Sequence, residues 1–296
     1  MNFQKIFVLG AGAIGSSYGA LLSRKNDVTL IGRKNQVKTI NIMGLEISGD
    51  IQERFFVRAE TKIRKIPSGT LILLTTKVHD SVKALTEIRK LLKNDTVILI
   101  LQNGLGNKEL VEEIVGDKIG VLRGLVMIGA ESSGYGKTTF WDGETILEKT
   151  ETGMRIAELF NRSGLKTRVL NGVERELWNK LVVNCVINPL TAILGVRDNE
   201  IVVDALKGIR HGIIDECVEV GMAEGIVFEP DLKEVLDKKI LQYTNFSSMC
   251  QDLIKGKRTE IDFLNGKIVE LGRKHRIPTP INKTLVSLIK SLEARQ

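Results

Sequence analysis

The sequence predicts an α/β protein with a doubly wound sheet in its N-terminal half and an all-α C-terminal domain. Short apolar runs that end in turn residues alternate with helical patterns through the N-terminal half. From Val173 onward the alternation typical of strands stops, and long helical patterns take over. A chain of 296 residues is also long for a single hydrophobic core. We therefore expect two domains, residues 1–171 and 172–296.

Charge and aromatic content narrow the class of ligand. The net charge is +7, but the basic residues are interspersed with acidic ones, and the chain has only three tyrosines and two tryptophans. A nucleic-acid-binding surface usually combines clustered cations with a recognisable motif, so nucleic acid is not the expected partner. A small anionic molecule is the ligand that this composition favours.

Cysteine usage and the hydropathy pattern predict the compartment. Cys185, Cys217 and Cys250 lack the paired spacing of a disulfide framework or of a metal site, so we expect neither. The N-terminus enters a strand pattern directly, without a signal peptide, and we expect that no apolar stretch of 18 residues occurs anywhere in the chain. The prediction is a cytoplasmic protein.

A glycine motif follows the first apolar run, residues 5–10. Gly10, Gly12 and Gly15 have GxGxxG spacing, a helical pattern follows them, and a second strand pattern comes at residues 27–31. This strand, turn and helix order is that of a Rossmann-type βαβ unit, which offers backbone amides to a pyrophosphate, although glycine triplets also occur in ordinary turns. The residues expected to contact a dinucleotide are Gly10, Ala11, Gly12, Ala13, Ile14 and Gly15.

The end of the second strand predicts which dinucleotide binds. Enzymes that use NAD usually carry an acidic residue there for the ribose 2′-hydroxyl, whereas this chain has Gly32, Arg33 and Lys34. Two cations without an acid favour NADP(H), with Arg33 beside the 2′-phosphate. The alternative is that both cations lie in a solvent-exposed loop.

Two polar residues follow later strand patterns. Lys77 comes after the apolar run 70–76, and Asn103 follows the run 96–101 within the segment QNGLG. Ligands of open α/β sheets bind beyond the carboxyl ends of the strands, so both side chains are candidates for the cofactor, and Asn103 also for the substrate. An exposed lysine and a simple Asn-Gly turn are the alternatives.

A polar stripe marks the first helix of the C-terminal half. Lys180, Asn184 and Asn188 stand four residues apart in an otherwise apolar segment, so they share one face of a helix. A lysine can donate a proton and amides can orient a small oxygen-rich ligand, which suggests chemistry on a carbonyl. The alternative is that the stripe faces water or a neighbouring helix. Pro189 predicts a kink or break beside it.

A second polar cluster occupies residues 244–259. Ser248 and Gln251 have the spacing of a capping box, and the helix start that they predict suits a substrate carboxylate. Thr259 is predicted to cap a further helix with Glu260 in its first turn. An acid there is stabilised by the helix dipole, so position alone favours a structural role for Glu260.

Five segments together resemble the ketopantoate reductases (2-dehydropantoate 2-reductases), over essentially the whole chain. The matching segments are VLGAGAIGSSYG, TTK ending at Lys77, QNGLGN around Asn103, WNKLVVNCVINPLTAI from Trp178 and SSMCQDLIKGKRTEIDFLNG from Ser247. The last two are more specific than the glycine motif. The resemblance implies NADPH-dependent reduction of 2-dehydropantoate to pantoate, on the route to pantothenate and coenzyme A.

The resemblance also implies roles for individual residues. By the family pattern, Lys180 is the proton donor to the ketone, and Glu260 supports both the substrate hydroxyl and the lysine. The residues implied to line the substrate pocket are Asn184, Asn188 and Ser248, and those implied near the nicotinamide are Lys77 and Asn103.

One loop departs from the family pattern. Family members commonly have small residues with Asn-Gly after the NPLTAI segment, where this chain has Asp198 and Asn199. A carboxylate there could repel an anionic substrate, and Asn199 would then have to make the substrate contact. Two other functions therefore stay open: an NADPH-dependent reductase of another 2-oxo acid, and an NADP-sensing binding protein without turnover. We also consider a homodimer.

Overall fold

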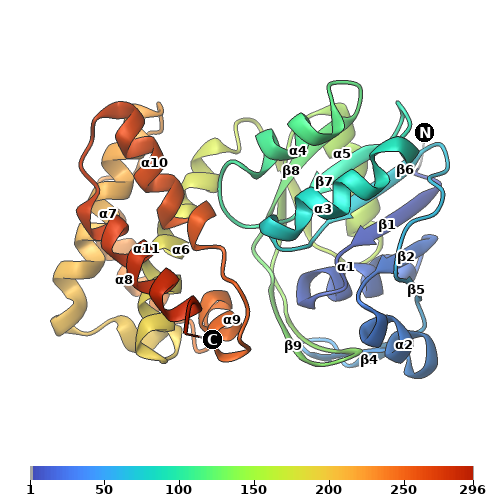
Figure 1. The fold of residues 1–296 in the computed structure, drawn as a ribbon, viewed down its shortest axis with the longest axis horizontal. Coiled ribbons are helices and arrows are strands. Elements are labelled where there is room, and N and C mark those ends of the chain that lie inside the picture. The colour runs from blue at the N-terminus through green and yellow to red at the C-terminus, as the bar shows by residue number, and fades with distance from the viewer. Residues whose placement is uncertain (1–2, 296) are drawn as a thin grey trace. The chain divides into compact units, whose positions relative to one another are not determined.

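The N-terminal part of the chain is built on an eight-stranded sheet, shown in Figure 1. The computed structural model describes residues 3–295. Strand order is β12-β11-β8-β7-β6-β1-β2-β5, and all pairs from β5 to β8 are parallel, while β11 is antiparallel to β8. The strands are β1 (Lys5–Leu9), β2 (Val28–Ile31), β5 (Arg58–Glu60), β6 (Thr70–Leu74), β7 (Val97–Ile100), β8 (Gly120–Val126), β11 (Thr145–Glu148) and β12 (Thr167–Leu170).

The central strands are buried along their whole length, as parallel strands covered on both faces are. Every residue of β1 and β6 is buried. Chain order reverses at β1, because β2 and β5 extend the sheet on one side of it and β6 begins the other side. This arrangement confirms the predicted doubly wound sheet, and ligands of such sheets bind beyond the carboxyl ends of the strands at the reversal point.

Helix α1 (Ala13–Ser23) packs against β1 and β2 of this sheet and also against a smaller sheet. The smaller sheet has the order β4-β3-β10-β9 and was not placed by the sequence patterns. Its strands are β3 (Leu45–Gly49), β4 (Glu53–Phe55), β9 (Gly129–Gly134) and β10 (Lys137–Trp141). Residues 15–22 of α1 are all buried, because the helix is covered on two sides. The other helices of this part are α2 (Lys34–Met43), α3 (Val78–Ile88), the 3₁₀ helix η1 (Arg89–Leu91), α4 (Asn107–Val115) and α5 (Glu151–Arg162).

The C-terminal part is helical, as predicted, and α6 (Glu174–Leu194) is its central element. Helix α6 packs against α7, α9 and α11, which explains why its apolar residues point to nearly all sides. The remaining elements are η2 (Asp198–Ile201), α7 (Asp204–Ala223), α8 (Leu232–Ile240), α9 (Ser248–Ile254), η3 (Ile261–Phe263), α10 (Asn265–His275) and α11 (Pro280–Glu293).

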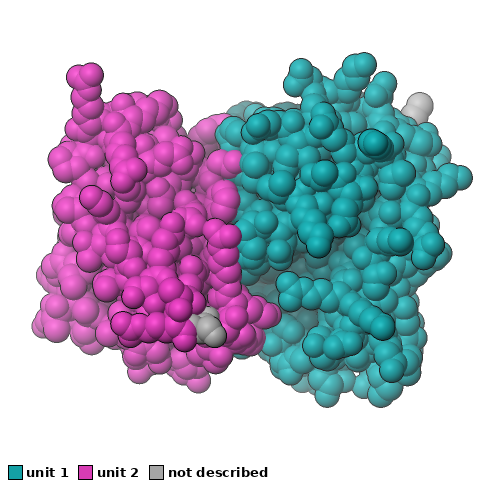
Figure 2. All heavy atoms as spheres, in the orientation of Figure 1, with its two compact units in different colours: residues 1–102, 107–173 teal, residues 103–106, 174–296 magenta. Residues whose placement is uncertain are grey.

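The chain divides into two compact units, coloured separately in Figure 2. The first comprises the residues up to Gln102 together with Asn107–Val173, and the second comprises Asn103–Gly106 together with Glu174–Gln296. The sequence patterns placed the division between residues 171 and 172, and did not separate the segment Asn103–Gly106 from the N-terminal part. Asn103–Gly106 therefore belongs to the helical unit, where the Leu105 amide donates to the Phe263 carbonyl at 3.0 Å.

Helix α6 is not broken at Pro189, which corrects one of the two outcomes predicted there, a kink or a break. An interior proline typically costs about 3 kcal/mol because it removes a helical hydrogen bond and crowds the carbonyl four residues before it. The helix nevertheless runs to Leu194. The carbonyl left without its helical donor, that of Cys185, instead accepts a hydrogen bond from the Asn265 side chain at 2.9 Å.

Helix α6 also corrects the expectation that no 18-residue apolar stretch occurs. Within residues 3–295 it is long and apolar enough to cross a membrane, with a mean hydropathy of 1.3 over its 18-residue window. Core helices of globular units pass the same criterion, and 56% of this window is buried inside the structure. Its polar stripe and its packing against α7, α9 and α11 fit a core helix.

Candidate active site

The surroundings of the three motif glycines show a different reason for glycine at each position. Gly10 has φ +120°, and a Cβ there would lie 2.6 Å from the Thr76 backbone nitrogen. A Cβ on Gly15 would lie 1.9 Å from the Gly10 carbonyl oxygen, so α1 must pack closely against the turn. A Cβ on Gly12 would meet nothing within 4 Å. Packing therefore requires Gly10 and Gly15, while the open side of Gly12 leaves room for a ligand to approach the backbone.

The start of α1 presents free backbone amides beside this open side. Gly12 is the N-cap residue and provides no side-chain hydrogen bond, and the first turn carries no acidic residue. Such a helix N-terminus favours an anion through its amides and its dipole. Ala13 and Ile14 begin this first turn, and Ala11 directly precedes the N-cap residue.

Two residues that the sequence patterns missed fix the glycine turn. The Thr75 hydroxyl donates to the Gly10 carbonyl at 2.7 Å. The Gln36 side chain donates to the Ala11 carbonyl at 3.1 Å and accepts from the Gly136 amide at 3.0 Å. Thr75 could have been suspected because it belongs to the TTK segment, but Gln36 lies in an unremarkable helical pattern and gave no signal.

Arg33 lies next to the glycine turn and is exposed. The preceding Gly32 packs on Ala11, since a Cβ on Gly32 would lie 2.8 Å from the Ala11 Cβ. The Arg33 side chain is 86% exposed and makes a long ion pair with Asp80, at 3.7 Å. An exposed pair at this distance contributes little to stability, so the guanidinium is able to exchange Asp80 for another anion.

The residues after β6 and β7 fall in different units. Lys77 is the partly buried N-cap residue of α3 in the first unit. Gln102, the last residue of that unit before the division, donates to the Thr76 carbonyl at 2.5 Å and to the Ser81 hydroxyl at 2.7 Å. Asn103 is partly buried and belongs to the helical unit. Lys77 and Asn103, both candidates for the cofactor by sequence position, therefore belong to different units.

The polar stripe on α6 is largely removed from solvent. Lys180 and Asn184 are partly buried, and Asn188 is buried. Burial lowers the pKa of Lys180 to about 8, against the opposing effect of the Glu260 carboxylate. Glu260 is itself buried in the helical unit. The structure thus brings the candidate acid of α6 into electrostatic contact with the carboxylate that follows the second polar cluster.

The second cluster joins the stripe through Ser248. Its hydroxyl donates to the Asn188 side-chain oxygen at 3.4 Å. Ser248 is not the helix cap that the sequence predicted, because Ser247 takes that place and accepts from the Cys250 amide at 3.1 Å. The Thr191 hydroxyl in turn donates to Ser247 at 2.7 Å, which ties α6 to α9. Ser248 is exposed and keeps its hydroxyl outside the cap.

The segment around Glu260 also differs from the prediction. Thr259 does not cap an α-helix, since Glu260 precedes the 3₁₀ helix η3 and α10 begins only at Asn265. The Thr259 hydroxyl accepts from the Ile261 amide at 3.2 Å instead. Glu260 therefore lies outside the first turn of an α-helix, which removes the structural reason that helix-dipole stabilisation had offered for an acid there.

Asp198 points into the helical unit. It is 4% exposed, accepts from the Asn245 amide at 2.8 Å, and returns a backbone hydrogen bond to the Asn245 carbonyl at 3.0 Å. Burial raises its pKa to about 7, against the opposing hydrogen bonds from Asn245 and the Ser247 backbone. Asn199 is partly buried, and its backbone amide donates to the Tyr243 carbonyl at 2.9 Å.

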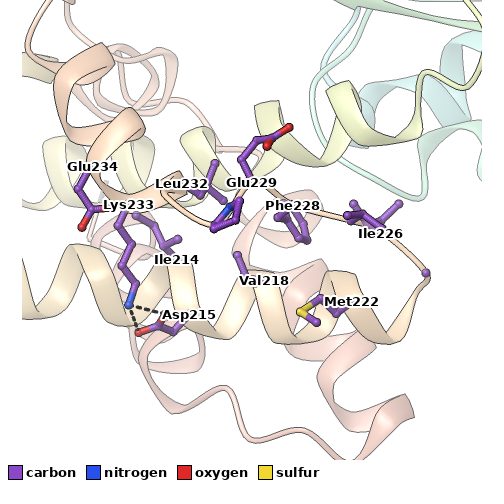
Figure 3. Close-up of a pocket in the computed structure, with 13 residues that line it drawn as sticks. Ile214, Asp215, Val218, Met222, Ile226, Phe228, Glu229, Leu232, Lys233 and Glu234 are labelled. Atoms are coloured by element: carbon purple, nitrogen blue, oxygen red, sulfur yellow. Dashed lines mark hydrogen bonds and ion pairs between the residues drawn. The ribbon is translucent and has the colours of Figure 1, made fainter.

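A separate concavity of about 740 Å³ lies elsewhere in the helical unit, between α7 and the segment leading into α8 (Figure 3). Figure 3 shows Ile214, Val218 and Phe228 lining it, with an ion pair between Lys233 and Asp215 at 2.6 Å beside them. None of the predicted site residues lines this concavity, so we do not assign it to the reaction.

Family models match most of the chain. The model of the ketopantoate reductase PanE/ApbA family matches residues 6–150, and the model of the C-terminal region of the same family matches residues 172–293. The chain belongs to the ketopantoate reductase family. This family is one of oxidoreductases, and it confirms the resemblance inferred from the five segments.

Named relatives of this ketopantoate reductase family member cover its whole length. The chain is 38% identical to the 2-dehydropantoate 2-reductase of Pyrococcus horikoshii over 98% of both chains. It is 32% identical to that of Archaeoglobus fulgidus over 99% of both chains.

Solved structures extend the comparison beyond one substrate. A PanE/ApbA family ketopantoate reductase from Ralstonia eutropha matches with a TM-score of 0.92 and 30% identity, over 98% of this chain and 99% of the other. D-mandelate dehydrogenase with NADH and anilino(oxo)acetate matches with a TM-score of 0.88 and 28% identity, over the same shares. The fold of this ketopantoate reductase family member is thus one that binds pyridine nucleotides.

Proposed function

We propose that this chain reduces 2-dehydropantoate to pantoate with NADPH, using Lys180 as the proton donor. The observation that carries the proposal is that two residues of the α6 stripe meet the second polar cluster in the helical unit, Lys180 through Glu260 and Asn188 through Ser248. All four belong to the two segments that are most specific to the family. The relatives named 2-dehydropantoate 2-reductase support the choice of substrate.

The chemistry needs an acid beside the ketone. The nicotinamide, when bound, supplies the hydride that attacks the ketone carbon. Lys180 donates a proton to the oxygen as negative charge develops there, and becomes neutral. Burial lowers the pKa of Lys180 to about 8, which makes its ammonium a stronger acid, while Glu260 favours the charged form that must be present at the start. Asn184, Asn188 and Ser248 are the groups that we assign to orient the substrate.

The dinucleotide is assigned to the first unit. The open side of Gly12 and the free amides of α1 suit the pyrophosphate, and Lys77 lies at the end of β6 near the reversal point. Asn103 and Asn199 remain candidates for the substrate by position.

NADPH is preferred over NADH in this proposal because Arg33 follows β2 where no acidic residue is present. We expect Arg33→Ala to raise the KM for NADPH by about tenfold or more and to leave the KM for NADH nearly unchanged, as loss of a phosphate contact should. Lys38→Ala, which removes another cation from α2, is the matched control. Equal preference ratios in wild type and Arg33→Ala would remove Arg33 from cofactor selection.

A substrate panel tests the reaction itself. Loss of NADPH absorbance is measured with 2-dehydropantoate, pyruvate, 2-oxoisovalerate and phenylglyoxylate in parallel. The proposal predicts the highest kcat/KM for 2-dehydropantoate. NADPH binding without turnover of any of the four would contradict it and favour the sensing function.

The second candidate is a reductase of another 2-oxo acid. The similarity to D-mandelate dehydrogenase favours it, as does Asp198 in a loop where family members commonly have an amide. The same lysine chemistry would apply, and phenylglyoxylate or 2-oxoisovalerate would then be the preferred member of the panel.

A further inference from the structure

A side chain of another helix replaces a missing backbone hydrogen bond of α6, between Asn184 and Asn188, two of the amides that we assign to orient the substrate. Pro189 has no N–H, so the carbonyl of Cys185 lacks the donor that a helix normally provides. Cys185 directly follows Asn184, and Pro189 directly follows Asn188. The missing hydrogen bond therefore falls within the segment that sets the spacing of Asn184 and Asn188.

Asn265 supplies the missing donor from the first residue of α10. Its side-chain nitrogen lies 2.9 Å from the Cys185 carbonyl oxygen, and the residue is completely buried. The second hydrogen of the same nitrogen is directed to the Asn282 side-chain oxygen at 2.8 Å. Both donor hydrogens of the Asn265 amide are thus used, one on each neighbouring helix.

The orientations of the Asn265 and Asn282 side-chain amides follow from the acceptors at the two ends of this series of hydrogen bonds, the Cys185 carbonyl and the Glu216 carboxylate. The Cys185 carbonyl can only accept, so the nitrogen of Asn265 must face it. At the other end, the Asn282 nitrogen donates to the Glu216 carboxylate at 2.7 Å, so the Asn282 oxygen must face Asn265. Glu216 also accepts from the backbone amides of Ile281 and Asn282, at 2.8 and 2.9 Å.

We propose that Asn265 is a positioning residue that holds α6 in register across Pro189 and thereby aligns Asn184 and Asn188 with Lys180. The inference rests on the proposed function for the roles of these three residues. Replacement by a residue without a donor leaves a buried carbonyl unsatisfied and lets α6 distort between the two amides. Substrate orientation is then lost although no group that touches the substrate has changed.

Restoring the backbone donor tests this role specifically. Asn265→Ala is compared with Pro189→Ala and with the double variant, in which residue 189 regains an N–H for the Cys185 carbonyl. We expect Asn265→Ala to raise the KM for the oxo acid by about tenfold or more, which corresponds to about 1.4 kcal/mol, and to lower Tm. The KM for NADPH should stay within about twofold. Pro189→Ala should bring both the oxo-acid KM and Tm back toward the wild-type values.

Asn282→Ala is the matched control, because it breaks the same buried network but leaves the bond from Asn265 to Cys185. It should lower Tm, and Pro189→Ala should not rescue it. A fall of Tm in Asn265→Ala with an unchanged oxo-acid KM would overturn the positioning role. Absence of rescue by Pro189→Ala, with Pro189→Ala itself folded, would overturn the hydrogen-bond replacement.

Two outcomes separate this inference from the proposed function. If Asn265→Ala fails to fold alone, recovery of folded protein by Pro189→Ala supports the replacement, and continued failure of the double variant contradicts it. Rescue of Tm needs no substrate. If the enzyme does not reduce 2-dehydropantoate, the proposed function is contradicted, but the Tm measurements still test the hydrogen bond between Asn265 and Cys185. The KM comparison is then made with the oxo acid that the panel identifies.

Discussion

Lys180 holds its charge in surroundings that oppose it, and this gives the reaction a pH dependence. Burial lowers the pKa of Lys180 to about 8 and Glu260 raises it. The protonated lysine is the form that donates, so kcat/KM for reduction should be constant below about pH 7 and fall above about pH 8. Glu260→Gln removes the charge that favours the ammonium, and should move the fall to lower pH. A pH–rate profile that stays flat to about pH 10 would exclude Lys180 as the acid.

The pKa of Asp198 is raised, whereas that of Lys180 is lowered, and the shift at Asp198 makes the stability of the folded protein depend on pH. Burial raises its pKa from 3.8 to about 7. A raised pKa means that the folded state prefers the proton, so the stability contribution is complete below pH 3.8 and is lost as pH rises through about 7. Asp198→Asn keeps an acceptor for Asn245 without the charge. The free energy of unfolding of Asp198→Asn, relative to that of wild type, should be about 2–3 kcal/mol higher at pH 8 than at pH 5.

Urea unfolding of wild type and Asp198→Asn at both pH values measures this difference. Asp215→Asn, an exposed acid on α7, is the control and should show little dependence on pH. A loss of stability in Asp198→Asn at pH 8 would mean that the carboxylate is needed in its charged form.

At the scale of elements, different glycines of the glycine turn serve packing and binding. An alanine at Gly12 meets no atom within 4 Å, whereas at Gly15 its Cβ would lie 1.9 Å from the Gly10 carbonyl oxygen. We expect Gly12→Ala to keep the wild-type Tm and to weaken NADPH binding by about tenfold or more, because the Cβ occupies the side open to the pyrophosphate. Gly15→Ala should lower stability by about 1–3 kcal/mol or more.

Thermal unfolding and NADPH titration of the two variants, side by side, measure both effects. The expected pattern is a binding defect without a stability defect for Gly12→Ala, and a stability defect for Gly15→Ala. Unchanged NADPH affinity in Gly12→Ala would place the pyrophosphate elsewhere.

Sequence patterns predicted the helices and strands that are determined by residues close together in the chain. The strand before Gly10, the buried strand before Lys77 and the amphipathic helices follow from hydropathy and turn residues in one stretch of chain. The wrong predictions concern details that one stretch of sequence does not decide. Helix α6 continues through Pro189, and Asn265 from α10 donates to the Cys185 carbonyl that lacks its helical donor. Ser247 rather than its neighbour Ser248 caps α9, where adjacent serines carry the same signal. The pairing of the strands of the smaller sheet was not predictable, because these strands are short and β3 pairs with β10 from a distant part of the sequence.

At the scale of the whole molecule, the predicted site residues divide between the two units. The glycine turn, Arg33 and Lys77 belong to the first, while Asn103 and the group around Lys180 belong to the second. The stripe of α6 was predictable from its spacing, but the pairing of Lys180 with Glu260 was not, since eighty residues of chain separate them. Only the family resemblance connected Glu260 to the lysine before the structure did.

The most direct measurement is hydride transfer by Lys180→Ala in a single turnover. Enzyme saturated with NADPH is mixed with saturating 2-dehydropantoate, and the loss of NADPH absorbance is followed. Our account predicts a rate lower by a factor of about 10² or more, with NADPH affinity retained, because the proton donor is missing. Lys233→Ala, which removes a partly buried lysine of the same unit that pairs with Asp215, should react at the wild-type rate. A rate for Lys180→Ala within about threefold of wild type would contradict the central claim.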